Sequence, residues 1–156
     1  MENEEKTTQY QGVSLVPEEI KVLSEFEKQI GEPIPYVEET NNVELGFTTE
    51  NRHVKHLRVL GKKLEGIPAD IDQLTQLELL VISRAEIMDL PSSVGNLKNL
   101  EILTIDSNKI STLPPSIGNL TNLKELWLDD NPIDTIPKEI GQLAELEILG
   151  LRYTPI

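Results

Sequence analysis

The chain has 156 residues and carries 27 acidic against 14 basic side chains, which gives a net charge of −13. This charge disfavours nucleic acids and anionic membrane surfaces as partners, because both bind through clustered Lys and Arg side chains. The chain contains no cysteine, which excludes disulfides, thiol catalysis and cysteine zinc sites, and no run approaches the ~18 apolar residues of a membrane span.

Residues 1–15 are polar and lack apolar periodicity, so we expect them to form a mobile acidic tail. The first residues, MENEEKTTQY, lack the basic region and the apolar run of a secretory signal. Together with the absence of cysteine, this favours a cytoplasmic protein.

Residues 16–52 are expected to form an N-terminal cap that begins with a helix over residues 17–30. Pro17 suits the first position of a helix, where its missing N–H would have no partner, and Gly31 suits the end. An apolar stripe runs along this helix through Val16, Ile20, Leu23, Phe26 and Ile30. This stripe predicts that one side of the helix packs on the rest of the protein.

A hairpin is expected to complete the cap. Apolar and polar residues alternate from Val43 to Phe47, which predicts a short strand near 43–47. The next strand begins at His53, after a polar turn in which Asn51 tolerates a left-handed conformation. The helix and the hairpin together would cover the open end of the repeats that follow.

A 23-residue unit recurs over residues 53–75, 76–98, 99–121 and 122–144, with a partial copy at 145–156. Each unit begins with alternating apolar and polar residues, which predicts a strand with one buried face. An apolar residue and a proline follow, as in Leu113-Pro114, and the apolar residues three and six places later predict a single helical or 3-10 turn. One unit cannot bury its apolar side alone, whereas stacked units share a continuous core.

The clearest copy, Asn99 to Thr121, reads NLEILTIDSNKISTLPPSIGNLT and resembles the leucine-rich repeat family with its pattern LxxLxLxxNxL. The LPxxIGxL form is similar to the intracellular subclass of Ras-scaffolding proteins and their plant relatives, and Gly46 to Pro68 resembles the first repeat of plant-type members. The resemblance implies an α/β right-handed solenoid, with a parallel sheet on the concave side and short helical or 3-10 turns on the convex side. It also implies a non-catalytic module that binds proteins, with small GTPases as one candidate class of partner.

The asparagine of this pattern is present only as Asn108 and Asn131. Lys62, Ala85 and Thr154 stand at the matching positions of the other copies. A buried asparagine side chain bonds the backbone of the loop after the strand, so we predict local irregularity around Lys62 and Ala85.

Function is expected from the outward positions of the strands, because the inward positions form the core. The first outward column is His56, Leu79, Ile102, Glu125 and Ile148, the second is Arg58, Val81, Thr104, Trp127 and Gly150, and the third is Leu60, Ser83, Asp106, Asp129 and Arg152. All of them except Leu60, Ser83 and Gly150 are candidate partner-binding residues. Trp127 lies at the centre, and tryptophan is enriched among interface hot spots.

Two features of this face allow alternative interpretations. Neighbouring apolar side chains could cover one another, in which case nothing binds. Asp106, Asp129 and Asp130 form an acidic edge that could orient a basic partner, or that could be an ordinary solvated charge pattern. No phosphate-binding loop, nucleophile motif or set of metal ligands occurs, so we expect no enzyme activity, no cofactor and no metal.

The C-terminal copy stops halfway, so four apolar residues are expected to face a missing neighbour: Leu146, Leu149, Leu151 and Ile156. The partial copy could fold over as its own cap, pair with a second molecule, or result from the shortening of a longer chain. The alternative function is therefore a structural or assembly role through this end. These possibilities leave a monomer or an end-to-end homodimer.

Overall fold

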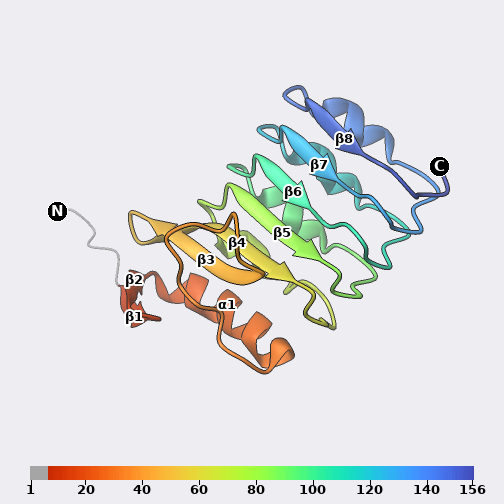
Figure 1. The fold of residues 1–156 in the computed structure, drawn as a ribbon. Coiled ribbons are helices and arrows are strands. Elements are labelled where there is room, and N and C mark those ends of the chain that lie inside the picture. Colours follow the sequence, from red (N-terminus) through yellow and green to blue (C-terminus); the bar gives the residue numbers. More distant parts are fainter. Residues whose placement is uncertain (1–6) are drawn as a thin grey trace.

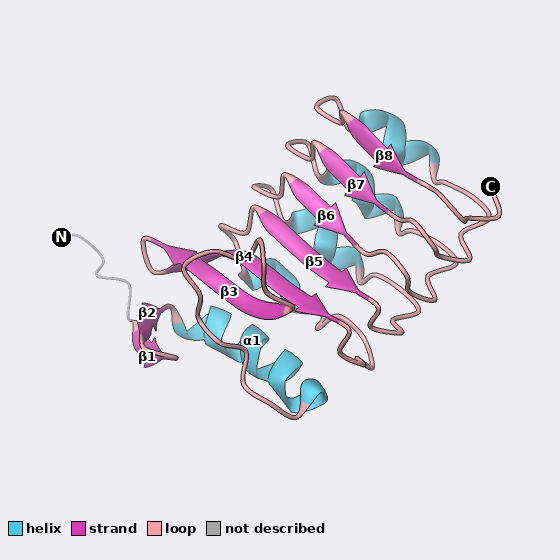
Figure 2. Cartoon of the chain, in the orientation of Figure 1, coloured by secondary structure: helices cyan, strands magenta, loops and turns pink. Residues whose placement is uncertain are grey.

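The computed structural model describes residues 7–156. Its main sheet contains six strands in chain order: β3 (Leu45–Glu50), β4 (His53–Leu60), β5 (Leu79–Ser83), β6 (Ile102–Thr104), β7 (Glu125–Trp127) and β8 (Ile148–Gly150). β4 to β8 are parallel, and β3 pairs antiparallel with β4. Figures 1 and 2 show the short helices behind the sheet, so the protein is the predicted right-handed solenoid.

Each repeat closes with a 3-10 helix on the convex side. These helices are η1 (Ile71–Gln73), η2 (Ser92–Asn96), η3 (Pro115–Asn119) and η4 (Lys138–Gln142). Neighbouring turns stack closely, because a Cβ atom added at Gly95 would lie 2.3 Å from the carbonyl oxygen of Ser116. One added at Gly118 would lie 2.5 Å from the carbonyl oxygen of Glu139. Glycine at these positions therefore lets successive turns approach each other.

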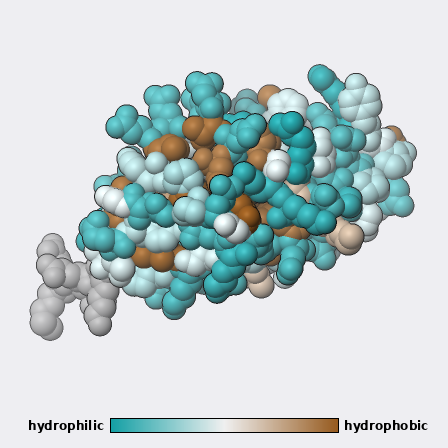
Figure 3. Space-filling view, turned by 60° about the horizontal axis from the view of Figure 1, so that its bottom comes forward, coloured by the Kyte–Doolittle hydropathy of each residue, from teal (hydrophilic) through white to brown (hydrophobic). Residues whose placement is uncertain are grey.

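The inward residues of the strands form a continuous core. Leu57, Leu80, Leu103 and Leu126 stand side by side in the sheet register, and all four are fully buried. Each such side chain contributes about 1.5–3 kcal/mol through burial. In the view of Figure 3, the largest area of apolar atoms lies in the middle of the molecule among hydrophilic side chains, and smaller apolar areas are visible away from it.

The two buried asparagines connect successive loops. The Asn108 side chain accepts hydrogen bonds from the backbone N–H groups of Ala85 (3.0 Å) and Ile87 (3.4 Å), and it donates to the carbonyls of Ile82 and Ile105. Asn108 therefore pairs with backbone N–H groups of the loop at Ala85, whose own repeat lacks the asparagine of the pattern.

The irregularity predicted where asparagine is missing is small. Gly61, Arg84, Ser107, Asp130 and Tyr153, which are 23 residues apart, all have positive φ, so the loops share one backbone shape. Around Ala85, only Glu86 adds a further positive φ.

The N-terminal cap contains the predicted helix, α1 (Pro17–Ile30). It ends at Gly31, whose φ is 81° and whose N–H donates to the carbonyl of Glu27 at 2.8 Å. The strand expected near 43–47 lies slightly later, as β3, because β3 follows the register of its partner β4. Phe26 of the helix and Phe47 of β3 are fully buried.

The prediction of a mobile tail over residues 1–15 is wrong for the second half of this segment. Residues 1–6 lie outside the described part, but β1 (Thr8–Tyr10) and β2 (Val13–Leu15) form an antiparallel hairpin. Two contacts hold the hairpin on the cap: Leu15 is fully buried, and the Tyr10 and Phe47 rings lie 5.9 Å apart. Because this contact is tertiary, the short polar sequence did not predict it.

A buried carboxylate joins α1 to the sheet. Glu19 is fully buried, and it accepts a hydrogen bond from the backbone N–H of Val54 at 2.8 Å. Its other oxygen lies 3.0 Å from Nδ1 of His53. The cap is therefore fixed on β4 by polar contacts as well as by its core.

The C-terminal end is covered less completely. Leu146 and Leu151 are half-buried and pack against the core, whereas Leu149 is 38% exposed and Ile156 is 57% exposed. In Figure 1 this end lies at the far end of the sheet from α1. Of the four residues expected to face a missing neighbour, two thus pack on the core and two remain exposed.

Candidate functional site

The strand register places the predicted columns side by side on the outer face of the sheet. His56 pairs with Leu79, Leu79 with Ile102, Ile102 with Glu125, and Glu125 with Ile148. The second column follows the same pattern from Arg58 to Gly150. We call the surface formed by the residues of the three columns the concave face.

The residues of the concave face differ in how far they can touch a partner. Val81 is only 5% exposed, so it supports the face from beneath. Ile148 is 38% exposed and Arg152 is also exposed. The remaining candidates are half-buried: His56, Arg58, Leu79, Ile102, Thr104, Asp106, Glu125, Trp127 and Asp129.

Trp127 is held in a fixed position on this face. Its indole N–H donates to Oε2 of Glu125 at 2.8 Å. A Cβ atom added at Gly150 would lie 2.6 Å from Cε3 of Trp127, so the ring rests against the neighbouring strand at the point where that strand has no side chain. A ring fixed in this way loses little conformational entropy when it contacts a partner.

The N-terminal cap reaches over the first strands of the concave face. In Figure 1 the segment between α1 and β3 passes in front of the sheet, and Arg58 donates from Nη1 to the carbonyl of Thr40 at 3.2 Å. Beside this contact lies a hollow of about 380 Å³, whose lining includes Glu38, Glu39, Thr40, Lys55, His56 and Glu78. Sequence analysis did not predict that the cap reaches the concave face. Pro33 and Pro35 indicate that the backbone after α1 is extended, but they do not indicate in which direction this segment runs.

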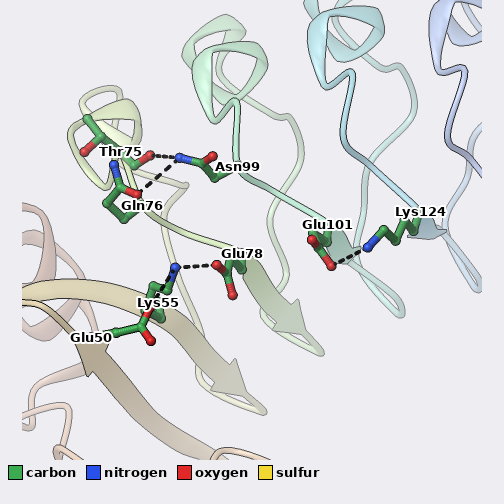
Figure 4. A network of polar contacts seen from close by, with 8 residues as sticks. All are labelled: Glu50, Lys55, Thr75, Gln76, Glu78, Asn99, Glu101 and Lys124. Carbon is green, nitrogen blue, oxygen red and sulfur yellow. Dashed lines mark hydrogen bonds and ion pairs between the residues drawn. The ribbon is translucent and has the colours of Figure 1, made fainter.

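A network of polar contacts fixes the beginnings of the strands, as Figure 4 shows. Lys55 pairs with Glu78 and, at 3.3 Å, with Glu50, while Lys124 pairs with Glu101 at 2.9 Å. The hydrogen bond that Lys55 donates to Glu78 raises the pKa of Lys55. Because these ion pairs join neighbouring strands at their edge, we assign them to positioning the strands.

The acidic edge lies at the other end of the strands. Asp129 accepts a hydrogen bond at Oδ1 from the backbone N–H of Arg152, 2.6 Å away. Burial raises the pKa of the Asp106 carboxyl, and the neighbouring Asp129 carboxylate raises it further, whereas a hydrogen bond from the Asp129 backbone lowers it. This edge therefore concentrates negative charge in a partly desolvated position.

Within residues 7–156, no group of three or more His, Asp or Glu side chains is arranged to hold a metal ion. The same part of the chain contains no helix that is long and apolar enough to cross a membrane.

Parallel strands stacked in register, each closed by a 3-10 turn and sharing one core, define the class of solenoid repeat proteins. Residues 32–155 match the family described as leucine-rich repeat region. The chain therefore belongs to the leucine-rich repeat family. The comparison with curated proteins gives no significant match.

Solved structures support this assignment. A leucine-rich repeat protein of Leptospira interrogans is 38% identical over 63% of this chain and 25% of its own, with a TM-score of 0.61. The plant peptide hormone receptor RGFR1, in complex with RGF2, is 34% identical over 64% of this chain and 17% of its own, with a TM-score of 0.60. An internalin of Listeria monocytogenes is 28% identical over 64% of this chain and 29% of its own, with a TM-score of 0.55. The chain thus spans less than a third of the length of these proteins.

Proposed function

We propose that the protein is a non-catalytic interaction module whose concave face binds a segment of a protein partner. The observation that carries the proposal is that Leu79 and Ile102 pair on β5 and β6, with Trp127 in the neighbouring column on β7, and that part of each side chain is exposed. Solvated sheet faces usually carry polar residues, whereas interface cores are apolar and aromatic. The similar plant receptor, solved as a complex with RGF2, supports this use of the fold.

The size of the face limits the partner. Five parallel strands about 4.8 Å apart span only about 20 Å, so the face can hold part of a partner without enclosing it. We include small GTPases among the candidate partners, by analogy with the Ras-group resemblance of the repeats. A cytoplasmic location is also part of the proposal, and imaging of a tagged chain in its own cell tests it.

Two substitutions on the concave face test the proposal. Affinity capture with the wild-type chain, followed by mass spectrometry, identifies a partner, and calorimetry with the purified partner then measures the affinity. We expect Trp127→Ala and Ile102→Asp each to weaken binding by 10-fold or more, because each removes apolar contact area. The matched control is Met88→Asp, because Met88 is 68% exposed and lies outside the three columns.

The thermal unfolding of each variant separates binding from folding. We expect unfolding temperatures close to that of the wild type, because both residues are only half-buried. If the two variants bind the partner as tightly as the wild type and Met88→Asp do, the concave face is not the binding site.

A second candidate function is assembly through the C-terminal repeat. It is favoured by the exposure of Leu149 (38%) and Ile156 (57%) beside β8, the last strand of the described sheet. Light scattering tests it, because an end-to-end dimer gives a mass that rises with concentration and falls in Leu149→Asp. A monomer mass at all concentrations contradicts this candidate.

A further inference from the structure

Two polar side chains lie next to each other in the third column of the concave face. Ser83 ends β5, and Asp106 lies two residues beyond the end of β6. The backbone ladder continues to this point, because the N–H of Arg84 donates to the carbonyl of Asp106 at 3.1 Å. Ser83 and Asp106 thus occupy matching positions in successive repeats, 23 residues apart.

Among the described residues, each of the two side chains has a buried oxygen atom without a hydrogen-bond partner. Ser83 is 5% exposed, and within residues 7–156 neither its hydroxyl nor Oδ1 of Asp106 has a hydrogen-bond partner. The next residue in the column differs, because Asp129 uses its Oδ1 to accept the N–H of Arg152. Buried polar groups are normally paired, so the Ser83 hydroxyl and Oδ1 of Asp106 have hydrogen-bonding capacity that the described structure leaves unused.

The electrostatics of this corner favour a cation. Burial raises the pKa of the Asp106 carboxyl and the Asp129 carboxylate beside it acts in the same direction, whereas a hydrogen bond from the Asp129 backbone lowers it. Arg152 follows one strand further on and is exposed. A positively charged donor at Asp106 would relieve both the desolvation and the like-charge repulsion.

We propose that Ser83, Asp106 and Asp129 form an anchor for a basic side chain of the partner, with arginine favoured over lysine. A guanidinium group offers several N–H donors in a planar fork, and the Ser83 hydroxyl and the Asp106 carboxylate offer acceptors on neighbouring strands. This inference rests on the proposed function, since Leu79, Ile102 and Trp127 would hold the residues that flank the arginine. The partner segment would therefore combine one arginine with apolar neighbours.

Three short peptides test the anchor: acetyl-Leu-Arg-Leu-amide, the same peptide with citrulline, and the same peptide with glutamate. Citrulline keeps the shape of arginine without its charge. Each is titrated into the full chain while NMR follows the backbone amide signals of residues 83, 106 and 129. We expect saturable shifts with the arginine peptide, at least five-fold weaker binding of the citrulline peptide, and no binding of the glutamate peptide.

Substitutions in the protein complete the test. Asp106→Asn is expected to weaken binding of the arginine peptide at least five-fold, and Ser83→Ala by a smaller factor. Asp134→Asn is the matched control, because it removes the same charge from an exposed residue outside the three columns, and it should leave binding unchanged. Equal binding of the arginine and citrulline peptides, no saturable shift with any peptide, or unchanged binding to Asp106→Asn would each overturn the anchor. The last result would fit a Ser83 hydroxyl that turns to donate to Asp106 within the free protein.

The purified partner distinguishes failure of the anchor from failure of the proposed function. If Trp127→Ala weakens binding of the partner and Asp106→Asn does not, the anchor is wrong and the concave face remains the binding site. If neither substitution weakens binding, both proposals are wrong.

Discussion

The two ends of the solenoid are closed in different ways. At the N-terminal end, β3 pairs with β4, and α1 buries Leu23 and Phe26 completely. At the C-terminal end, Leu149 and Ile156 remain exposed beside the last strand. In the described structure, the first repeat thus packs against a cap, whereas the last repeat leaves apolar side chains exposed.

This difference indicates how stability is distributed along the chain. In a repeat protein each unit is stabilised mainly by its neighbours, so a unit with one neighbour opens more easily than a unit with two. The cap supplies the missing neighbour for the first repeat. We therefore expect equivalent substitutions to have large effects near the cap and small effects near β8.

The largest expected effect is that of Phe26→Ala. Phe26 is fully buried between the cap and the repeats, and removal of such a ring typically costs about 3–5 kcal/mol of unfolding free energy. Leu149→Ala, its counterpart at the other end, should cost less than about 1 kcal/mol because its side chain already contacts water. Urea unfolding followed by circular dichroism measures both. Similar losses in the two variants would contradict the idea that the ends differ.

The next effect comes from the asparagine positions. Asn108→Ala leaves the buried N–H of Ala85 and the carbonyl of Ile82 without their side-chain partner, so we expect a loss of roughly 2–3 kcal/mol. Thr154, at the matching position of the last copy, donates only to the carbonyl of Leu151. Thr154→Ala should therefore cost only about 0.5–1 kcal/mol in the same urea assay. A loss in Thr154→Ala as large as in Asn108→Ala would show that the last loop is as tightly held as the inner ones.

A pair of glycines sharpens the comparison, because the two substitutions should act in opposite directions. A Cβ atom at Gly118 would lie 2.5 Å from the carbonyl oxygen of Glu139, so Gly118→Ala should cost about 1–3 kcal/mol through overpacking. A Cβ atom at Gly141 has no neighbour within 4 Å in the described structure, and Gly141→Ala should gain up to about 1 kcal/mol by restricting the unfolded chain. Thermal unfolding detects both signs. A stabilising Gly118→Ala would show that the inner turns are not closely stacked.

Much of the fold follows from the sequence, because a 23-residue period determines many positions at once. Leu103 and Leu126 are buried, while Thr104 and Trp127 face outward, as the alternation predicts. The boundaries of α1 also follow from local chemistry, since Pro17 starts the helix and Gly31 ends it.

The parts that sequence analysis missed depend on contacts between distant residues. The hairpin β1–β2 is short, and the burial of Leu15 and the contact between Tyr10 and Phe47 hold it in place. The segment before β3 lies over the concave face because Arg58 reaches the carbonyl of Thr40. The polar network of Figure 4 follows the period, but the sequence does not reveal which of its charges pair. Nor does the period reveal that the Ser83 hydroxyl lacks a partner, because that depends on side-chain conformation.

The smallest expected effects are those of substitutions at Asp106 and Asp129, the carboxylates that follow two successive strands. Asp106 lies inside the solenoid, and Asp129 lies beside the last repeat. The pKa of Asp106 is raised in the folded protein, mainly by burial, so the folded state binds its proton more tightly than the unfolded state does. Asp106 therefore destabilises the fold once the pH rises above its pKa, and the penalty disappears in acid, where the residue is protonated in both states.

It follows that Asp106→Asn should be slightly more stable than the wild type at pH 7, by less than about 1 kcal/mol, and should lose this advantage as the pH falls toward the pKa of Asp106. Asp129→Asn should be destabilising at pH 7, because it weakens the acceptor of the Arg152 N–H at the last repeat. Urea unfolding at several pH values measures both differences. A gain in Asp106→Asn that is the same at pH 7 and in acid would show that the charge of Asp106 is not its cause.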